Sequence, residues 1–164
     1  MAKKVNKTLA MKVLDGRKIS YEVVAYPGNM RDAEEIAQEL GVPPGQVFKT
    51  LVALPPEGYG RNAKPILAVI PANRQLNLKK LAKLLGVKKV KMASHKEAEA
   101  LTGLQVGGIS PLALLNKGFL VYLDTAAREQ TKIYISAGQR GWQIKLDVPD
   151  LVKVAGAKWG EMGD

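Results

Sequence analysis

A single lysine interrupts an apolar segment in the first third of the chain, QVFKTLVALP at residues 46–55. Side chains of a strand alternate between two faces, so Lys49 has apolar neighbours whichever face is buried. One interpretation is a lysine whose stem packs against the sheet while its ammonium group reaches water. The other is an ammonium group at the rim of a pocket, where it would stabilise developing negative charge. The strand alone favours the first interpretation.

Two glycine-containing segments could bring backbone amides close to a ligand. The segment TGLQVGGISP at 102–111 has adjacent glycines, Gly107 and Gly108, within an apolar stretch. The segment SAGQRG at 136–141 follows an expected strand and contains Arg140. Glycine permits a close backbone approach or a positive φ, so either segment can be a binding loop or an ordinary turn. Taken singly, each is more typical of a turn.

Several other catalytic chemistries lack the residues they need. The chain has no cysteine, which excludes disulfides, thiolate zinc sites and cysteine nucleophiles. Its one histidine, His95, follows the expected helix cap Ser94 and is expected on a solvated first turn rather than in a catalytic triad. Neither of the glycine-rich nucleotide-binding motifs, G-x-x-x-x-G-K-[ST] and G-x-G-x-x-G, occurs in the sequence. We therefore expect neither a metal nor a cofactor.

The charge balance is strongly basic, with 25 lysines and arginines against 15 aspartates and glutamates, a net charge of +10. This balance indicates a polyanionic partner, of which nucleic acid is the commonest, or a lysine-rich solvated surface. No apolar run approaches the ~18 residues of a membrane helix. Polar residues interrupt any signal-peptide core at the N-terminus, so we expect a cytoplasmic protein with no membrane partner.

Capping residues and hydrophobic periodicity predict a mixed order of helices and strands. Helices are expected at 8–15, 32–41, 77–86, 94–101 and 147–154, beginning at the caps Asp32, Asn77, Ser94 and Asp147. Glycines end two of them, Gly41 and Gly86. Strands are expected at 19–24, 47–54, 66–70, 87–92, 119–123, 131–136 and 142–146, with a turn-rich loop at 55–65.

This order has no regular strand–helix–strand rhythm, and short loops separate the last three strands. The pattern predicts an α+β fold, with a curved, mixed but mostly antiparallel, barrel-like sheet and surrounding helices. The length of 164 residues supports one domain over 1–164, because two would each have a small core.

Four segments, in their order along the chain, together resemble one family. They read VFKTLV, LNLKKLAKLLGVKKVKMA, TGLQVGGISP and IYISAGQRGWQIKL. They are similar to the YbaK/EbsC-type aminoacyl-tRNA deacylases, stand-alone relatives of the editing domain inserted in bacterial prolyl-tRNA synthetases. The resemblance implies an enzyme that removes a mischarged amino acid from tRNA, with cysteine on proline tRNA as the leading substrate. It implies aminoacyl-tRNA as a partner and a prolyl-tRNA synthetase as a second candidate partner.

The resemblance also implies roles for particular residues. Lys49 matches the essential lysine of the family, and Gly107 with Gly108 match a glycine loop beside the aminoacyl ester. Four further residues match positions that line the substrate pocket: Tyr26, Thr50, Ser136 and Gly138. In members that clear cysteine, the thiol of the substrate attacks its own ester, whereas members that act on alanine use water.

Three departures from the family pattern affect selectivity and tRNA contacts more than catalysis. Leu104 stands where a tyrosine is usual, LALLNKG at 112–118 replaces a basic segment, and PGNMRD at 27–32 lacks the usual polar pattern. Two alternatives therefore stay open. One is a deacylase for another small residue, such as alanine on proline tRNA. The other is a non-catalytic RNA-binding or synthetase-associated module with the same fold.

Overall fold

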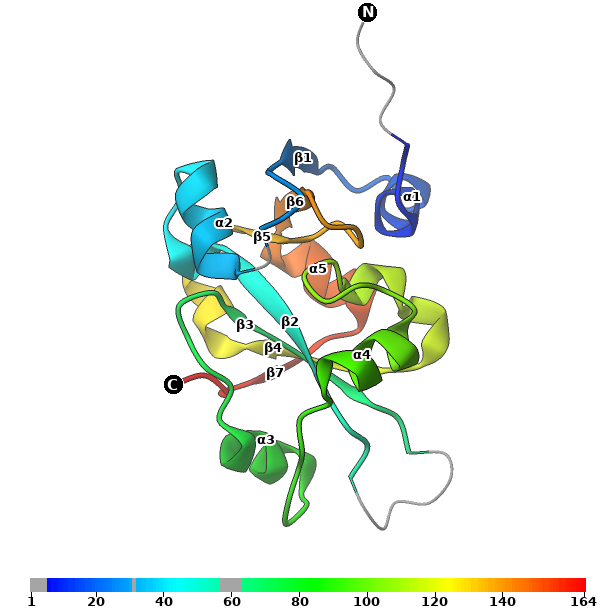
Figure 1. The fold of residues 1–164 in the computed structure, drawn as a ribbon, viewed down its shortest axis with the longest axis vertical. Coiled ribbons are helices and arrows are strands. Elements are labelled where there is room, and N and C mark those ends of the chain that lie inside the picture. The colour runs from blue at the N-terminus through cyan, green and yellow to red at the C-terminus, as the bar shows by residue number, and fades with distance from the viewer. Residues whose placement is uncertain (1–5, 31, 57–62) are drawn as a thin grey trace, which may run out of the picture.

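The protein folds as two sheets surrounded by short helices, seen in a computed structural model that describes residues 6–30, 32–56 and 63–164 (Figure 1). The helices are α1 (Leu9–Gly16), α2 (Ala33–Leu40), α3 (Leu78–Leu85), α4 (His95–Thr102) and α5 (Val148–Ala155). The strands are β1 (Glu22–Ala25), β2 (Phe48–Ala53), β3 (Ile66–Pro71), β4 (Leu120–Asp124), β5 (Lys132–Ser136), β6 (Trp142–Asp147) and β7 (Lys158–Gly160). This is the predicted α+β class.

The two sheets are separate, and the predicted barrel-like closure is wrong for the described residues. One sheet has the order β1-β6-β5 and is antiparallel throughout. The other has the order β2-β3-β4-β7, with β2 antiparallel to β3 but β4 parallel to both β3 and β7. A single parallel bridge between Val47 and Tyr134 links the sheets, which is too little pairing to close them into one barrel.

Strand β3 is the centre of the larger sheet because it is apolar on both faces. All six of its residues are buried, as expected for a strand covered from both sides. One face of the sheet packs in the larger core with Phe48, Val52 and Leu67. The other face packs with Leu81 and Ala82 of α3 in a second core.

The predicted helix boundaries follow from local capping chemistry. The side chain of Asn77 accepts from the N–H of Lys80 at the start of α3, and Ser94 with Glu97 forms a capping box at the start of α4. Gly41 and Gly86 end α2 and α3 in the left-handed conformation, where a side chain would be strained. Asp147 does precede α5, but its side chain makes no capping bond and lies 3.9 Å from Lys132 instead.

Two strand assignments differ from the sequence prediction. Residues 87–92 form no strand, and only Met92 makes an isolated bridge, with Ala53. Only Val90 of the three apolar residues Val87, Val90 and Met92 is buried, so the segment offers no continuous apolar face. Strand β7 was not predicted, because its three residues carry little periodicity of their own. The turn-rich loop predicted at 55–65 falls partly on residues 57–62, which lie outside the described part of the chain.

A buried carboxylate attaches the C-terminal segment to the end of β4. Asp124 is only 4% exposed and accepts backbone N–H bonds from Ala126 at 2.9 Å, Met162 at 3.0 Å and Gly163 at 2.7 Å. Gln75 and Asp164 exchange two further backbone bonds, of 3.2 and 2.9 Å. The segment after β7 is therefore part of the core rather than a tail. In the described residues no helix is long and apolar enough to span a membrane.

We expect Asp124→Ala to lower the free energy of unfolding by about 2–4 kcal/mol, because it leaves three backbone N–H groups without their charged acceptor. Urea denaturation measures the change. The control is Glu129→Ala, an exposed carboxylate in the turn that follows β4, which we expect to change stability by less than about 0.5 kcal/mol. Equal small effects in both variants would contradict this account of the C-terminal attachment.

Candidate functional site

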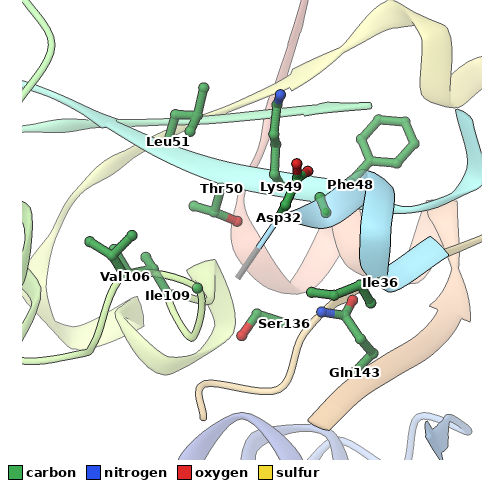
Figure 2. A pocket seen from close by; sticks show the side chains of 12 residues that line it. Asp32, Ile36, Phe48, Lys49, Thr50, Leu51, Val106, Ile109, Ser136 and Gln143 are labelled. Carbon is green, nitrogen blue, oxygen red and sulfur yellow. The ribbon is translucent and has the colours of Figure 1, made fainter. Parts of the chain in front are cut away.

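A small pocket lies between the two sheets, where segments distant in sequence meet (Figure 2). Its volume is about 180 Å³, room for several water molecules or one small side chain with its backbone atoms. The pocket is lined by the start of α2, the first four residues of β2, the loop at 106–109 and one residue each from β5 and β6. These residues are Asp32, Ala33, Ile36, Phe48, Lys49, Thr50, Leu51, Val106, Gly107, Ile109, Ser136 and Gln143.

The pocket opens along the outer edge of β2, which is the terminal strand of its sheet. At one end of this edge Val47 bridges to Tyr134, and at the other end residues 91–93 bond to residues 52–54. Between these contacts no strand of the described chain pairs with the edge. The pocket therefore occupies the gap between the two paired stretches.

The direction of the backbone groups in this gap follows from the alternation of an antiparallel ladder. Val52 accepts a bond from Ala93, and Leu54 donates one to Lys91, so even-numbered residues point their N–H and C=O groups outward. Val47, an odd-numbered residue, instead accepts from Ala72, in line with β3. The N–H and C=O groups of Thr50 consequently point toward the pocket. A backbone donor is thus available there without any special side chain.

Lys49 lines the pocket, but its ammonium group lies on the carbonyl of Ala72. The Nζ–O distance is 3.3 Å. Because side chains alternate along a strand, Lys49 projects from the face of β2 opposite Thr50, as Figure 2 shows. Burial lowers the pKa of Lys49 below its ordinary value, and the negative charges of Asp32 and Glu34 offset part of that effect. The lysine is therefore neither a fully solvated surface residue nor part of an ion pair of 4 Å or less among the described residues.

Asp32 supplies the pocket's negative charge while it caps α2. One of its carboxylate oxygens accepts from the N–H of Glu34 at 2.9 Å. Asp32 also lines the pocket near Lys49 (Figure 2). The sequence indicated the capping role, and the second position follows only from the packing of α2 beside β2.

Two buried side-chain oxygens beside the pocket have no hydrogen-bond partner in the structure. They are Oγ1 of Thr50 and Oε1 of Gln143, and Gln143 is only 4% exposed. A buried polar atom without a partner costs roughly 1–3 kcal/mol, so such atoms are commonly satisfied by water or a ligand. The Ser136 hydroxyl, which also lines the pocket, already accepts from the N–H of Gly138 at 3.1 Å. Polar groups of three strands therefore converge on one small space.

The two glycine loops predicted as candidates pack directly against each other. A Cβ atom added to Gly108 would lie 2.9 Å from the backbone nitrogen of Arg140, closer than real Cβ atoms come. The Nε atom of Arg140 donates to the carbonyl of Val106 at 2.7 Å. Gly107 has a φ of 91° and lines the pocket, whereas the N–H of Gly108 bonds to Gln105 in the turn. Gly108 thus holds the loop in place, and Gly107 faces the cavity.

Of the seven residues predicted for the site, Lys49, Thr50, Gly107 and Ser136 line this pocket, and the other three lie outside its lining. Gly108 and Gly138 belong to the loops behind it. Tyr26 is 6% exposed, its backbone bonds to Gly141, and its buried hydroxyl has no partner in the structure. Their roles as substrate contacts stay predictions.

The sequence did not predict Gln143 as a site residue. It lies in an alternating strand, WQIKLD, where a polar residue between apolar ones usually faces solvent. The tertiary structure places this side chain inside, next to Ser136 of the adjoining strand. The alternation groups Gln143 with Lys145 and Asp147 on the polar face of the strand, so the sequence contains no signal that would have found it.

Comparison with known proteins identifies the family. The model of the aminoacyl-tRNA editing domain matches residues 27–154. The chain belongs to the aminoacyl-tRNA editing domain family. It is 39% identical to EbsC of Enterococcus faecalis, which carries the provisional name Cys-tRNA(Pro)/Cys-tRNA(Cys) deacylase, over 99% of this chain and 98% of EbsC.

Two further relatives place the domain in two settings. The proline–tRNA ligase of Nitratidesulfovibrio vulgaris is 35% identical over 71% of this chain, but the match covers only 18% of that enzyme. A crystal structure described as a candidate trans-editing enzyme for prolyl-tRNA synthetase superposes with a TM-score of 0.80. It is 25% identical and covers 95% of each chain. The domain therefore occurs both inside a synthetase and as a separate chain.

We expect Gly108→Ala to lower the free energy of unfolding by about 1–3 kcal/mol, because the added methyl group meets backbone atoms that cannot move aside cheaply. Gly45→Ala is the matched control, since a Cβ atom at that position meets nothing within 4 Å. Thermal melts of both variants measure the effect. A Gly108→Ala protein as stable as Gly45→Ala would show that the loops do not need this close approach.

Proposed function

We propose that this chain is a trans-acting aminoacyl-tRNA deacylase, which removes a mischarged amino acid from tRNA, with cysteine as the first candidate residue. One observation carries the proposal: in an editing-family domain, a small pocket gathers unpaired polar groups beside a half-buried ammonium group and a glycine loop. The match to EbsC over nearly the full length of both chains supports this proposal.

The pocket composition suits an ester that is already activated. Its lining has two titratable side chains, Asp32 and Lys49, and its hydroxyl groups on Thr50 and Ser136 have no histidine within the lining to act as their base. Such a site works by positioning the ester and stabilising the oxyanion that forms on its carbonyl. The outward N–H group of Thr50 and the ammonium group of Lys49 are the proposed donors. Lys49 would release Ala72 and swing its flexible stem around the edge of β2.

The nucleophile would come from the substrate or from water. With cysteine, the substrate sulfur forms a bond to its own ester carbonyl carbon, and the ester C–O bond breaks. The thiol proton is transferred to the departing ribose oxygen, which gives a cyclic thioester and free tRNA. With alanine, water takes the place of the thiol. Neither route requires a nucleophilic side chain from the protein.

The pocket size favours a small aminoacyl group. A volume of about 180 Å³ is below the ~300–1,000 Å³ range of ordinary small-molecule pockets. Ile36, Phe48 and Ile109 supply its apolar walls, which accept a thiol or a methyl group more readily than a charged side chain. Cysteine leads because EbsC is named for it, and alanine on proline tRNA is the second candidate. A cytoplasmic location and a prolyl-tRNA synthetase partner belong to the same proposal.

A purified-protein assay over Cys-, Ala-, Ser- and Pro-charged tRNAs tests the activity. We expect the fastest deacylation with the cysteinyl ester. Deacylation of none of the four, by a folded protein, would favour the non-catalytic RNA-binding or synthetase-associated module.

Substitution of Lys49 separates a catalytic lysine from a packing lysine. We expect Lys49→Ala to slow single-turnover deacylation of Cys-tRNA by ~10²–10³, the typical loss when one oxyanion-stabilising donor is removed. We expect Lys49→Arg to be nearly as slow, since a planar guanidinium is bulkier than an ammonium group and the pocket is small. The control is Lys145→Ala, which removes a partly exposed strand lysine outside the pocket. A folded Lys49→Ala protein within about threefold of wild type would mean that the lysine only packs.

The stability of a Lys49→Met variant provides an independent test of the same residue. Burial depresses the pKa of Lys49, so between the folded and unfolded pKa values the unfolded chain binds more protons and stability rises with pH. The charged lysine is therefore an unfavourable contribution to folding at pH 7. We expect Lys49→Met to melt at the same temperature as wild type or higher at pH 7, while its deacylation is lost. A clear fall in melting temperature would indicate that the lysine serves stability.

Metal removal should leave the activity unchanged. The chain has no cysteine, and His95, its one histidine, is exposed at the start of α4. Among the described residues no group of three histidine, cysteine or acidic side chains could hold a metal ion. We expect equal deacylation rates before and after dialysis against EDTA. Activity that disappears and returns with added zinc would contradict this mechanism.

A further inference from the structure

The net positive charge of the chain is concentrated in one segment. Residues 77–96 contain seven lysines and no aspartate or glutamate. This segment therefore carries +7 of the net charge of +10 of the whole chain. The segment comprises α3, the turn after Gly86 and the run that leads into α4.

Four of the exposed lysines lie on α3 or in the turn directly after it, and they have no carboxylate within 4 Å among the described residues. They are Lys79, Lys83, Lys88 and Lys89, here called the lysine surface. Lys79 and Lys83 are four residues apart on α3 and so lie on one side of that helix. Lys88 and Lys89 follow directly after the left-handed Gly86. Lys80 differs, because Glu161 and Asp164 hold its ammonium group at 3.3 and 3.0 Å.

The carboxylates that pair with α3 in the described chain contact Lys80 and not the lysine surface. The buried face of α3, with Leu81 and Ala82, packs on the larger sheet, and Lys80 faces the C-terminal segment. Glu161 and Asp164, both in that segment, are the two partners of Lys80. The four lysines of the lysine surface have no such partner among the described residues, and clustered positive charge of this kind attracts a polyanion.

The lysine surface lies at the opposite end of β2 from the pocket. Ala93 bonds to Val52 near the end of β2, and Lys91 bonds to Leu54 just after it. The pocket instead lies along the first four residues of the strand. At 3.3 Å per residue, the five steps from Lys49 to Leu54 correspond to about 17 Å of strand. A ligand that reaches both places must be long and negatively charged along its length. A tRNA with its acylated end in the pocket meets both requirements.

We infer that the lysine surface binds the phosphate backbone of the tRNA, away from the acylated nucleotide. This inference rests on the proposed function for the identity of the polyanion. Lysine contacts to phosphate carry no sequence information, so this surface adds affinity without choosing among tRNAs. Selection of the amino acid then belongs to the pocket alone.

Binding of uncharged tRNA as a function of salt concentration tests this inference without using the deacylation reaction. Two double variants neutralise the surface, Lys79→Gln with Lys83→Gln and Lys88→Gln with Lys89→Gln. Each should reduce the slope of log K against log salt by about 1.4–1.8, that is, two contacts at ~0.7–0.9 each. Each should also weaken binding roughly tenfold near physiological salt. Glutamine preserves helix propensity, so folding should be unaffected.

The matched control is Lys12→Gln with Lys153→Gln, which removes the same charge from exposed positions on α1 and α5. We expect this variant to bind tRNA with nearly the wild-type slope. Equal slopes for the control and both surface variants would overturn the inference, because affinity would then depend on net charge alone. Wild-type slopes in both surface variants would overturn it as well.

A second measurement keeps this inference separate from the proposed function. The surface variants should deacylate a cysteinyl ester of a short CCA trinucleotide as fast as wild type, because that substrate does not reach α3. With full-length Cys-tRNA at subsaturating concentration they should be slower in proportion to their loss of affinity. If no variant and no wild-type protein deacylates either ester, the proposed function fails while the binding result still decides the lysine surface.

Discussion

The unpaired stretch of the β2 edge is the constraint on which the rest of the site depends. Backbone N–H and C=O groups that lie inside a protein without partners are costly, so a fold normally covers or pairs such an edge. Here the bridge at Val47 and the bonds to residues 91–93 pair both ends and leave the middle open. The gap is bounded by α2 on one side and by the glycine loop at 106–109 on the other. The outward-facing backbone groups of this pocket result from sheet geometry, and α2 and the loop enclose them.

The loops around that gap are held by one another rather than by regular structure. Gly108 lets the 102–111 loop approach the backbone of Arg140, and the Arg140 side chain returns to bond Val106. This mutual support places Gly107 and Ser136 on the same cavity although they are far apart in sequence. Loops fixed in this way can position an ester without the cost of ordering them on binding. The same close packing makes the site sensitive to any added side chain.

Electrostatics divides the molecule into two regions with different tasks. Near the pocket, Lys49, whose pKa is lowered by burial, and the helix-capping Asp32 provide charge. The space around them is partly desolvated, so each electrostatic interaction is stronger there than in water. On α3 and the turn after it, solvated lysines provide a diffuse positive field. The first arrangement suits discrimination at short range, and the second suits recruitment of a long polyanion. Strand β2 and its backbone bonds to residues 91–93 connect the two regions.

Features that depend on neighbours along the chain could be predicted from the sequence. The helix boundaries at Asn77, Gly86 and Ser94 follow from capping chemistry, and the conspicuous Lys49 and the Gly107–Gly108 pair were visible as departures from local patterns. The α+β class followed from the order of the predicted helices and strands, which the same local patterns give.

The pairing of strand edges and the burial of side chains depend on the packing of distant segments. The parallel pairing of β3 with β4, the three-residue strand β7 and the open form of the two sheets depend on partners many residues away. Segment 87–92 had the composition of a strand but only Met92 bridges to another segment, so it stayed irregular. Gln143 looked like a solvent-facing residue until β5 and α2 enclosed it. Burial and edge pairing are properties of the packed chain, which a linear pattern can constrain but not specify.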